Sequence, residues 1–205
     1  MSSCTSHFIE NFTNIINVDI KETVNANYKL IEKNNIGTGK VSEMSINGSI
    51  NNLSFTLDKS LTCSHGEEIN ILRFLNSSTK NITKKNDLIV ICPKDKDGYL
   101  DLHIFIIELK SDKTSGAGNQ ILCGKIFVDY LISIYKLHFD CKFDVKVSYY
   151  GIIASSKTVN MRQASTSKNS FYNFNPIKKN GVEIKILNWN PKTKLPLNDI
   201  YNKTS

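Results

Sequence analysis

The feature that most constrains the fold is a pair of apolar segments followed by a long helical pattern. NDLIVICP (86–93) and YLDLHIFIIELK (99–110) flank DKDG (95–98), whose Asp-Gly pair tolerates the positive φ of a tight turn. A small-residue turn then leads into GNQILCGKIFVDYLISIYKL (118–137), the longest helical pattern in the chain. A hairpin followed by such a helix predicts an α/β fold.

The remaining patterns extend this fold into a central mixed sheet flanked by helices. Residues 1–25 indicate a short amphipathic lead-in. We expect strands over 27–33, 39–46, 51–58, 143–156 and 182–189, a helix over 64–77, an irregular segment over 157–176 and a loose tail after Pro191. These elements predict one domain over 1–205, with an N-terminal elaboration (1–63), a core (64–155) and a C-terminal loop with a last strand (156–205).

Composition is that of an ordinary globular protein, with 40% hydrophobic and 22% charged residues in 205. The five cysteines form no CxxC pair, which favours reduced thiols and a cytoplasmic location. We expect no membrane partner, since the N-terminus does not resemble a signal peptide and the apolar runs are shorter than the ~18 residues of a spanning helix. A net charge of +7 favours a polyanionic partner without specifying one.

The second strand of the hairpin ends in two charges on its apolar face. Residues two apart in a strand share a face, so Leu102, Ile104, Ile106, Glu108 and Lys110 should point the same way. Burying a carboxylate and an ammonium costs several kcal/mol per ion unless partners compensate. The pattern therefore indicates a functional site, although a solvated strand end with a cross-strand pair is the structural alternative.

Asp87 opens the preceding strand and should lie near Glu108 at one end of the sheet. Two acidic oxygens with a backbone carbonyl suit a hard cation such as Mg²⁺, for which Mn²⁺ can substitute. A neighbouring lysine can orient a water or neutralise charge on a phosphate, as metal-assisted phosphodiester cleavage requires. Alternatively, Asp87 is a strand-entry residue that satisfies a backbone N–H.

Two further polar residues are candidates for the same site. In the helix expected over 64–77, Glu68 falls within the apolar face, whereas Glu67 and Arg73 fall outside it. Gln120 lies one helical turn before Gly124, where a glycine would let the helix approach the sheet. An early-helix glutamine with no role in the site is the alternative.

Together these residues resemble the PD-(D/E)xK nuclease superfamily, which is restriction-endonuclease-like. The resemblance rests on Glu68, Asp87, Glu108 with Lys110, and Gln120, in that order over residues 64–155. It implies an αβββαβ core, with extra N-terminal strands here. It further implies that Asp87 and Glu108 hold Mg²⁺, that Glu68 adds a metal contact, that Lys110 positions the attacking water and that Gln120 supports the site. In this chain Asn86 stands where the family motif has proline.

The resemblance implies a metal-dependent nuclease acting on DNA or RNA, in defence, restriction or DNA processing. The candidate nucleic-acid contacts are basic residues, three of them interleaved with aromatic residues in the segment 157–175: Arg73, Lys157, Arg162 and Lys168. A solvated loop is the alternative for that segment. The whole fold can also serve as a binding module for nucleic acid or a protein with little catalysis, and a protein partner or homodimer is compatible with either function. Cys63 and His65 are a weak zinc signal, since no second pair accompanies them.

Overall fold

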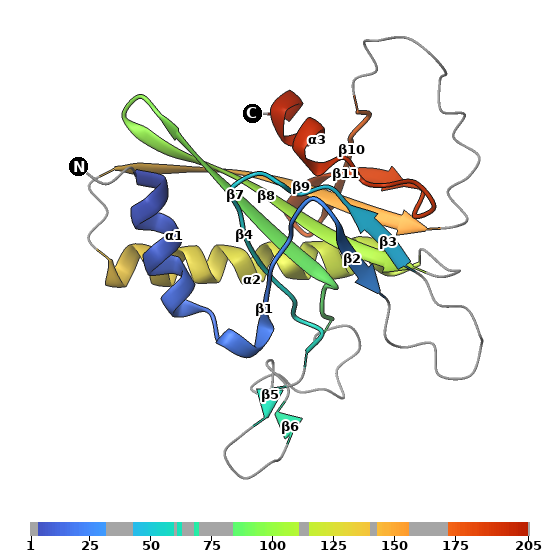
Figure 1. Ribbon diagram of the computed structural model, residues 1–205, viewed down its shortest axis with the longest axis horizontal. Helices are drawn as coiled ribbons and strands as arrows, with labels where there is room; N and C mark the ends of the chain where they lie inside the picture. Colours follow the sequence, from blue (N-terminus) through green and yellow to red (C-terminus); the bar gives the residue numbers. More distant parts are fainter. Residues whose placement is uncertain are drawn as a thin grey trace.

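The computed structural model describes residues 4–31, 43–59, 61–62, 68–69, 84–110, 115–139, 143–155 and 172–204. Over these residues the chain is an α/β protein, with a mixed sheet of seven strands flanked by three α-helices (Figure 1). The expected fold class is confirmed at this level.

The seven-stranded sheet combines antiparallel and parallel neighbours. Its order is β1 (Lys21–Glu22), β4 (Leu53–Phe55), β7 (Leu88–Lys96), β8 (Tyr99–Lys110), β9 (Asp144–Ser155), β11 (Val182–Trp189) and β10 (Asn175–Lys179). The pairs β8–β9 and β9–β11 are parallel, and the other neighbours are antiparallel.

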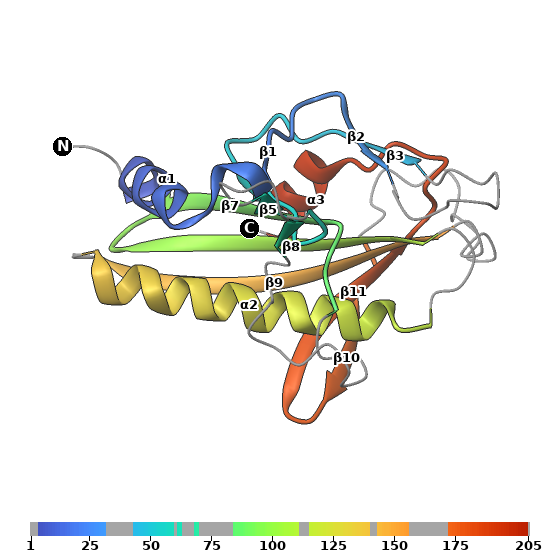
Figure 2. The ribbon, with the colours of Figure 1, turned by 90° about the horizontal axis from the view of Figure 1, so that it is seen from below.

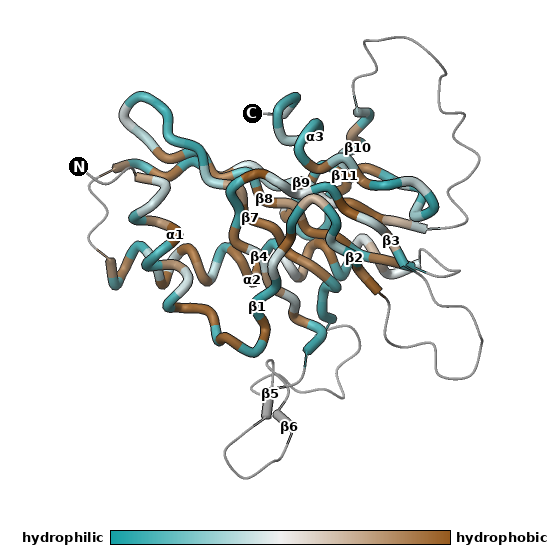
Figure 3. Tube along the Cα trace, in the orientation of Figure 1, coloured by the Kyte–Doolittle hydropathy of each residue, from teal (hydrophilic) through white to brown (hydrophobic). Residues whose placement is uncertain are grey.

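The hairpin of β7 and β8 forms the centre of the sheet. Lys96 pairs with Tyr99, so the turn consists of Asp97 and Gly98, and Gly98 has the positive φ (82°) that the Asp-Gly signal predicts. Residues 88–93 of β7 are all buried, because both faces of the sheet are covered. In Figure 3 hydrophobic residues follow the body of β7 and β8, whereas the turn is hydrophilic.

Helices α1 (Cys4–Ile15) and α2 (Ala117–His138) pack on one face of this sheet. Phe8 and Phe12 of α1 contact Tyr135 of α2, with ring centroids 5.0 and 5.9 Å from it. Helix α2 connects the parallel strands β8 and β9, as a parallel pair requires. A short 3-10 helix (Val18–Ile20) leads from α1 into β1.

Helix α3 (Leu197–Thr204) and a separate hairpin of β2 (Tyr28–Ile31) and β3 (Glu43–Ile46) cover the opposite face. Figure 2 shows α2 on one side of the sheet and these elements on the other. Their buried side chains, including Leu30, Met44 and Ile200, pack against Phe105 and Ile107 of β8.

Several expectations were wrong in detail. Glu68–Ile69 form strand β6, paired with β5 (Leu61–Thr62), so the helix expected over 64–77 does not include Glu68. The tail after Pro191 contains α3, which buries its own residues Leu197 and Ile200 against the sheet, next to the buried Leu195. Strand β10 lies partly in the segment expected to be irregular, whereas the amphipathic lead-in expected over 1–25 contains the helix α1.

No helix in the described part of the chain combines the length and the apolar character needed to cross a membrane.

Candidate functional site

Asp87 and Glu108 meet where the β7–β8 hairpin opens, at the end far from its turn. Leu88 pairs with Ile107, so the next step of the same register places Asp87 opposite Glu108. The Asp87 carboxylate accepts a hydrogen bond from the Leu109 N–H, with an N–Oδ2 distance of 2.6 Å. Asp87 therefore has the structural role considered above, and this contact also holds it beside Glu108.

Glu108 is a fully buried carboxyl group, with 0% of the residue exposed. Its Oε2 atom has no hydrogen-bond partner among the described residues, and its Oε1 atom is 2.5 Å from Lys110 Nζ. Burial raises the pKa of Glu108 to about 8; the charges of Asp87 and Asp58 add to that rise, and Lys110 opposes it. The solvated strand end considered as an alternative is excluded.

Lys110 reaches Glu108 from the last residue of β8. Its side chain is 19% exposed, so the ammonium group spans the buried carboxyl and the surface. Among the described residues, Lys110 is the lysine that acts on the Glu108 carboxyl, and the charges of Asp87 and Asp58 act on it as well. Two further carboxylates therefore act on the same buried group as the Lys110 ammonium.

Helix α2 approaches the acid pair closely because Gly124 has no side chain. A Cβ atom on Gly124 would lie 2.1 Å from Asn86 Oδ1 and 3.0 Å from Ile106 Cγ2. Asn86 is fully buried, and neither polar atom of its side chain has a hydrogen-bond partner within the described ranges. The close approach expected at Gly124 is therefore present.

Gln120 lies one turn earlier on α2 and faces the entry to β7. Its Nε2 atom donates a hydrogen bond of 2.9 Å to the Lys85 carbonyl, two residues before Asp87. This contact joins the start of α2 to the segment that positions Asp87. Gln120 thus lies next to the acid pair as expected, and its described contact is structural.

A cleft of about 250 Å³ borders Asp87 on the side away from α2, between β1, β2 and β4. Its lining includes Asp58, Glu22 and Lys59, and the last two form an ion pair of 2.7 Å. Asp58 follows Thr56 and Leu57 at the end of β4, and its charge raises the pKa of Glu108. Sequence reasoning missed Asp58, because only the pairing of β4 with β7 brings it to this position.

Asp87 and Glu108 are suited to a divalent cation. The unpartnered Oε2 of Glu108 is buried beside a second carboxylate, and hard cations prefer oxygen ligands. Within the described ranges, no three acidic, histidine or cysteine side chains are close enough to form a complete site. The residues present therefore fit a cation held by one or two carboxylates and waters, as Mg²⁺ commonly is.

The other predicted site residues lie beyond the structural description. The Glu68 side chain, Arg73, Lys157, Arg162 and Lys168 are outside it, as are Cys63 and His65. The helical phase that placed Glu68 on a buried face does not apply, since its backbone forms a strand.

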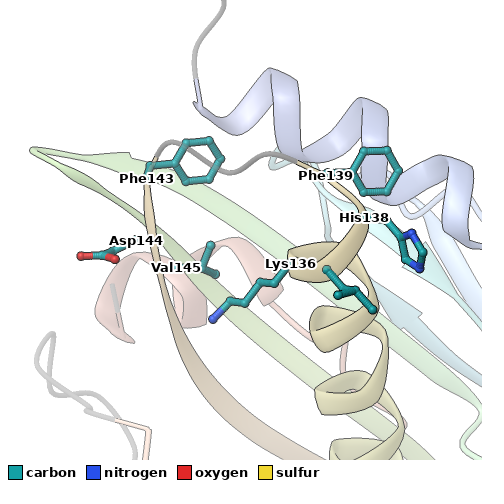
Figure 4. Close-up of a pocket in the computed structure, with 7 residues that line it drawn as sticks. Lys136, His138, Phe139, Phe143, Asp144 and Val145 are labelled. Atoms are coloured by element: carbon teal, nitrogen blue, oxygen red, sulfur yellow. The ribbon is translucent and has the colours of Figure 1, made fainter.

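A second hollow, of about 520 Å³, lies at the far end of α2 (Figure 4). It is lined by Lys136, Leu137, His138, Phe139, Phe143, Asp144 and Val145. Asp144 is the one carboxylate among these residues, so the hollow does not reproduce the acid pair.

No protein-family model, curated protein or solved structure matches this chain.

Proposed function

We propose that the chain is a metal-dependent nuclease that hydrolyses phosphodiester bonds. The observation that carries the proposal is Glu108, a fully buried carboxyl group with one unpartnered oxygen, held between Asp87 and Lys110. A structural ion pair would not need a second carboxylate at the same point, because the added repulsion destabilises the folded chain. Perturbed carboxyl groups of this kind are typical of functional sites.

The order of elements supports the same class of enzyme. With the short strands β1, β2, β3, β5 and β6 set aside, the described chain passes through α1, then the neighbouring strands β4, β7 and β8, then α2, and then β9 parallel to β8. This order agrees with the αβββαβ arrangement of the PD-(D/E)xK superfamily. In this proposal α1 takes the place of the first helix, which the sequence pattern placed over 64–77.

Each residue has a separate task in this proposal. Asp87 and Glu108 would hold Mg²⁺ or Mn²⁺, which when bound supplies a Lewis acid and an activated water. Lys110 provides the positive charge that orients the water and offsets charge developing on the phosphate. Gln120 positions the entry to β7 through the Lys85 carbonyl.

Replacing Lys110 by alanine is expected to lower cleavage at least ~100-fold, the usual contribution of a positioned catalytic group. The substrates are supercoiled plasmid, linear duplex DNA, single-stranded DNA and structured RNA, each with Mg²⁺, Mn²⁺ or EDTA. Lys136→Ala is the matched control, since Lys136 is an exposed lysine near the other end of α2. Equal cutting by wild type and Lys110→Ala would contradict the proposal, and no cutting by either would favour a binding module.

Replacing Asp87 by asparagine is expected to abolish stabilisation by Mg²⁺ while largely preserving the fold. Asparagine Oδ1 can still accept the Leu109 N–H, but the negative charge that would hold the cation is lost. The measurement is the melting temperature with and without millimolar Mg²⁺, which should rise for wild type and not for the variant. Asp19→Asn, at an exposed position, is the control, and an unchanged Mg²⁺ response in Asp87→Asn would exclude Asp87 as a ligand.

A further inference from the structure

Strands β10 and β11 form a narrow ribbon at one edge of the sheet. Lys179 pairs with Val182, so the turn consists of Asn180 and Gly181, whose φ angles of 50° and 82° are those of a tight two-residue turn. We call residues 175–186 the basic ribbon. Figure 2 shows it projecting past α2, away from the body of the sheet.

The exposed surface of the basic ribbon is mainly positive. Lys178, Lys179 and Lys185 are all exposed, and Glu183 is the one acidic residue in 175–186. Glu183 lies opposite Lys178 in the ladder, which leaves Lys179 and Lys185 without an acidic neighbour in the pairing. The tip is hydrophilic in Figure 3.

The inner side of the basic ribbon contacts the first turn of α2. A Cβ on Gly118 would lie 3.1 Å from Ile177 Cδ1, and Lys179 Nζ donates a hydrogen bond of 3.0 Å to Asn119 Oδ1. Gln120, the next residue of that turn, binds the Lys85 carbonyl beside Asp87. One helical turn therefore separates the basic ribbon from the entry to the acid pair.

Lys84 adds a second positive charge near Cys123 of α2. Burial raises the pKa of the Cys123 thiol, and the charges of Lys179 and Lys84 both oppose that rise. Both ammonium groups are therefore within electrostatic range of Cys123, although one comes from β10 and the other from the segment before β7. Positive charge near this part of α2 therefore comes from two segments that are distant in sequence.

We propose that the basic ribbon binds double-stranded DNA, inserting into the major groove while its lysines contact the flanking phosphates. The major groove of B-form DNA is about 12 Å wide and admits a two-stranded ribbon. In A-form RNA that groove is deep and too narrow for side chains to read. Exposed lysines at the edge and tip complement the phosphates on either side of the groove. This inference rests on the proposed function, because it names double-stranded DNA as the substrate of the site at Asp87 and Glu108.

The test measures binding without cleavage. Fluorescence anisotropy in EDTA compares a short labelled DNA duplex, an RNA duplex of the same sequence and the corresponding single strand. The variants are Lys178→Glu/Lys179→Glu and the milder Lys178→Gln/Lys179→Gln. Lys136→Glu/Lys192→Glu, at exposed positions outside the basic ribbon, gives the control the same change in net charge.

Wild type should prefer the DNA duplex, and the ribbon charge reversal should weaken that binding roughly tenfold or more. For Lys178→Gln/Lys179→Gln, the slope of the logarithm of the DNA association constant against the logarithm of the salt concentration should be smaller in magnitude by up to ~1.8. This is the change expected for two lost phosphate contacts. Equal losses of DNA affinity in the ribbon and control variants would overturn the inference. The ribbon lysines would then serve only to protect an edge strand from pairing with another chain. Equal affinities for the RNA and DNA duplexes would also overturn it, as would the absence of binding to DNA.

The two proposals can fail separately. If Lys110→Ala binds the DNA duplex like wild type and wild type does not cut, the ribbon stands and the nuclease fails. If cutting depends on Lys110 but not on the ribbon lysines, the nuclease stands and the ribbon fails.

Discussion

Replacing Glu108 by glutamine is expected to stabilise the folded chain at pH 8 and to abolish cleavage in the same variant. The buried carboxyl has a pKa of about 8 against an ordinary 4.5, so the folded chain loses stability relative to the unfolded chain as the pH rises from 4.5 to about 8. Glutamine is neutral and of similar size, although its buried amide carries a smaller cost of its own. We expect a net gain of about 2 kcal/mol in unfolding free energy in EDTA, or a melting temperature higher by ~6 °C.

The gain should depend on pH with a definite sign. Below pH 4.5 Glu108 is protonated in the folded and unfolded chains, and it contributes nothing to the difference. As the pH rises from 4.5 to about 8, the unfolded chain ionises first, so wild type loses stability that Glu108→Gln retains. Wild type and Glu108→Gln should therefore have the same melting temperature at about pH 4, and the difference between them should be largest at about pH 8.

Thermal melts of both proteins across this range, with Glu10→Gln as an exposed control, measure the effect. Adding Mg²⁺ should stabilise wild type and not Glu108→Gln, because the variant lacks the second carboxylate. A variant less stable than wild type at every pH would show that the Glu108–Lys110 ion pair contributes more than the buried charge costs. That result would remove the main support for a cation site.

Replacing Gly124 by alanine is expected to destabilise the fold by about 3 kcal/mol, or lower the melting temperature by ~8 °C. The new methyl group would lie 2.1 Å from Asn86 Oδ1, so the buried Asn86 side chain, α2 or the entry to β7 must move. Alanine favours a helix by ~1 kcal/mol over glycine, which offsets only part of this cost. Cleavage should fall as well, because the same displacement moves Asp87.

A double-mutant cycle tests whether Asn86 is the obstacle. Asn86→Ala removes both atoms that the new methyl group meets first, so Asn86→Ala/Gly124→Ala should recover much of the loss. Gly118→Ala is the matched control, since its Cβ would meet only the flexible end of Ile177 at 3.1 Å. Additive losses in the cycle would mean that Gly124 is needed for a reason other than its contact with Asn86.

The central part of the fold was predictable, since local signals there agree with the tertiary structure. The Asp-Gly turn fixes the β7–β8 register, and that register alone brings Asp87 to Glu108. The close approach of α2 to the sheet at Gly124 could be predicted because one helical turn separates Gly124 from Gln120. The turn, the register and the Gln120–Gly124 spacing all involve residues close together in the sequence, so a sequence pattern can predict them.

The remaining differences arise from contacts between distant segments. The charge of Asp58 reaches Glu108 only because β4, more than thirty residues earlier, pairs with β7. Glu68 fits a helical pattern, yet its pairing with Thr62 makes it a strand. Strand β10 was missed although Asn180–Gly181 is a strong hairpin signal, because the basic residues before it were interpreted as a loop.

The order of strands also bears on how the chain avoids self-association. Strands β7 and β8 are the most apolar segments, and exposed they would template aggregation. Both lie inside the sheet, whose outer strands are β1, only two residues long, and β10, which carries two exposed lysines. Short and lysine-bearing edges offer little free backbone to another chain. The lysines proposed to contact DNA thus also make this edge of the sheet a poor template for a second copy of the chain.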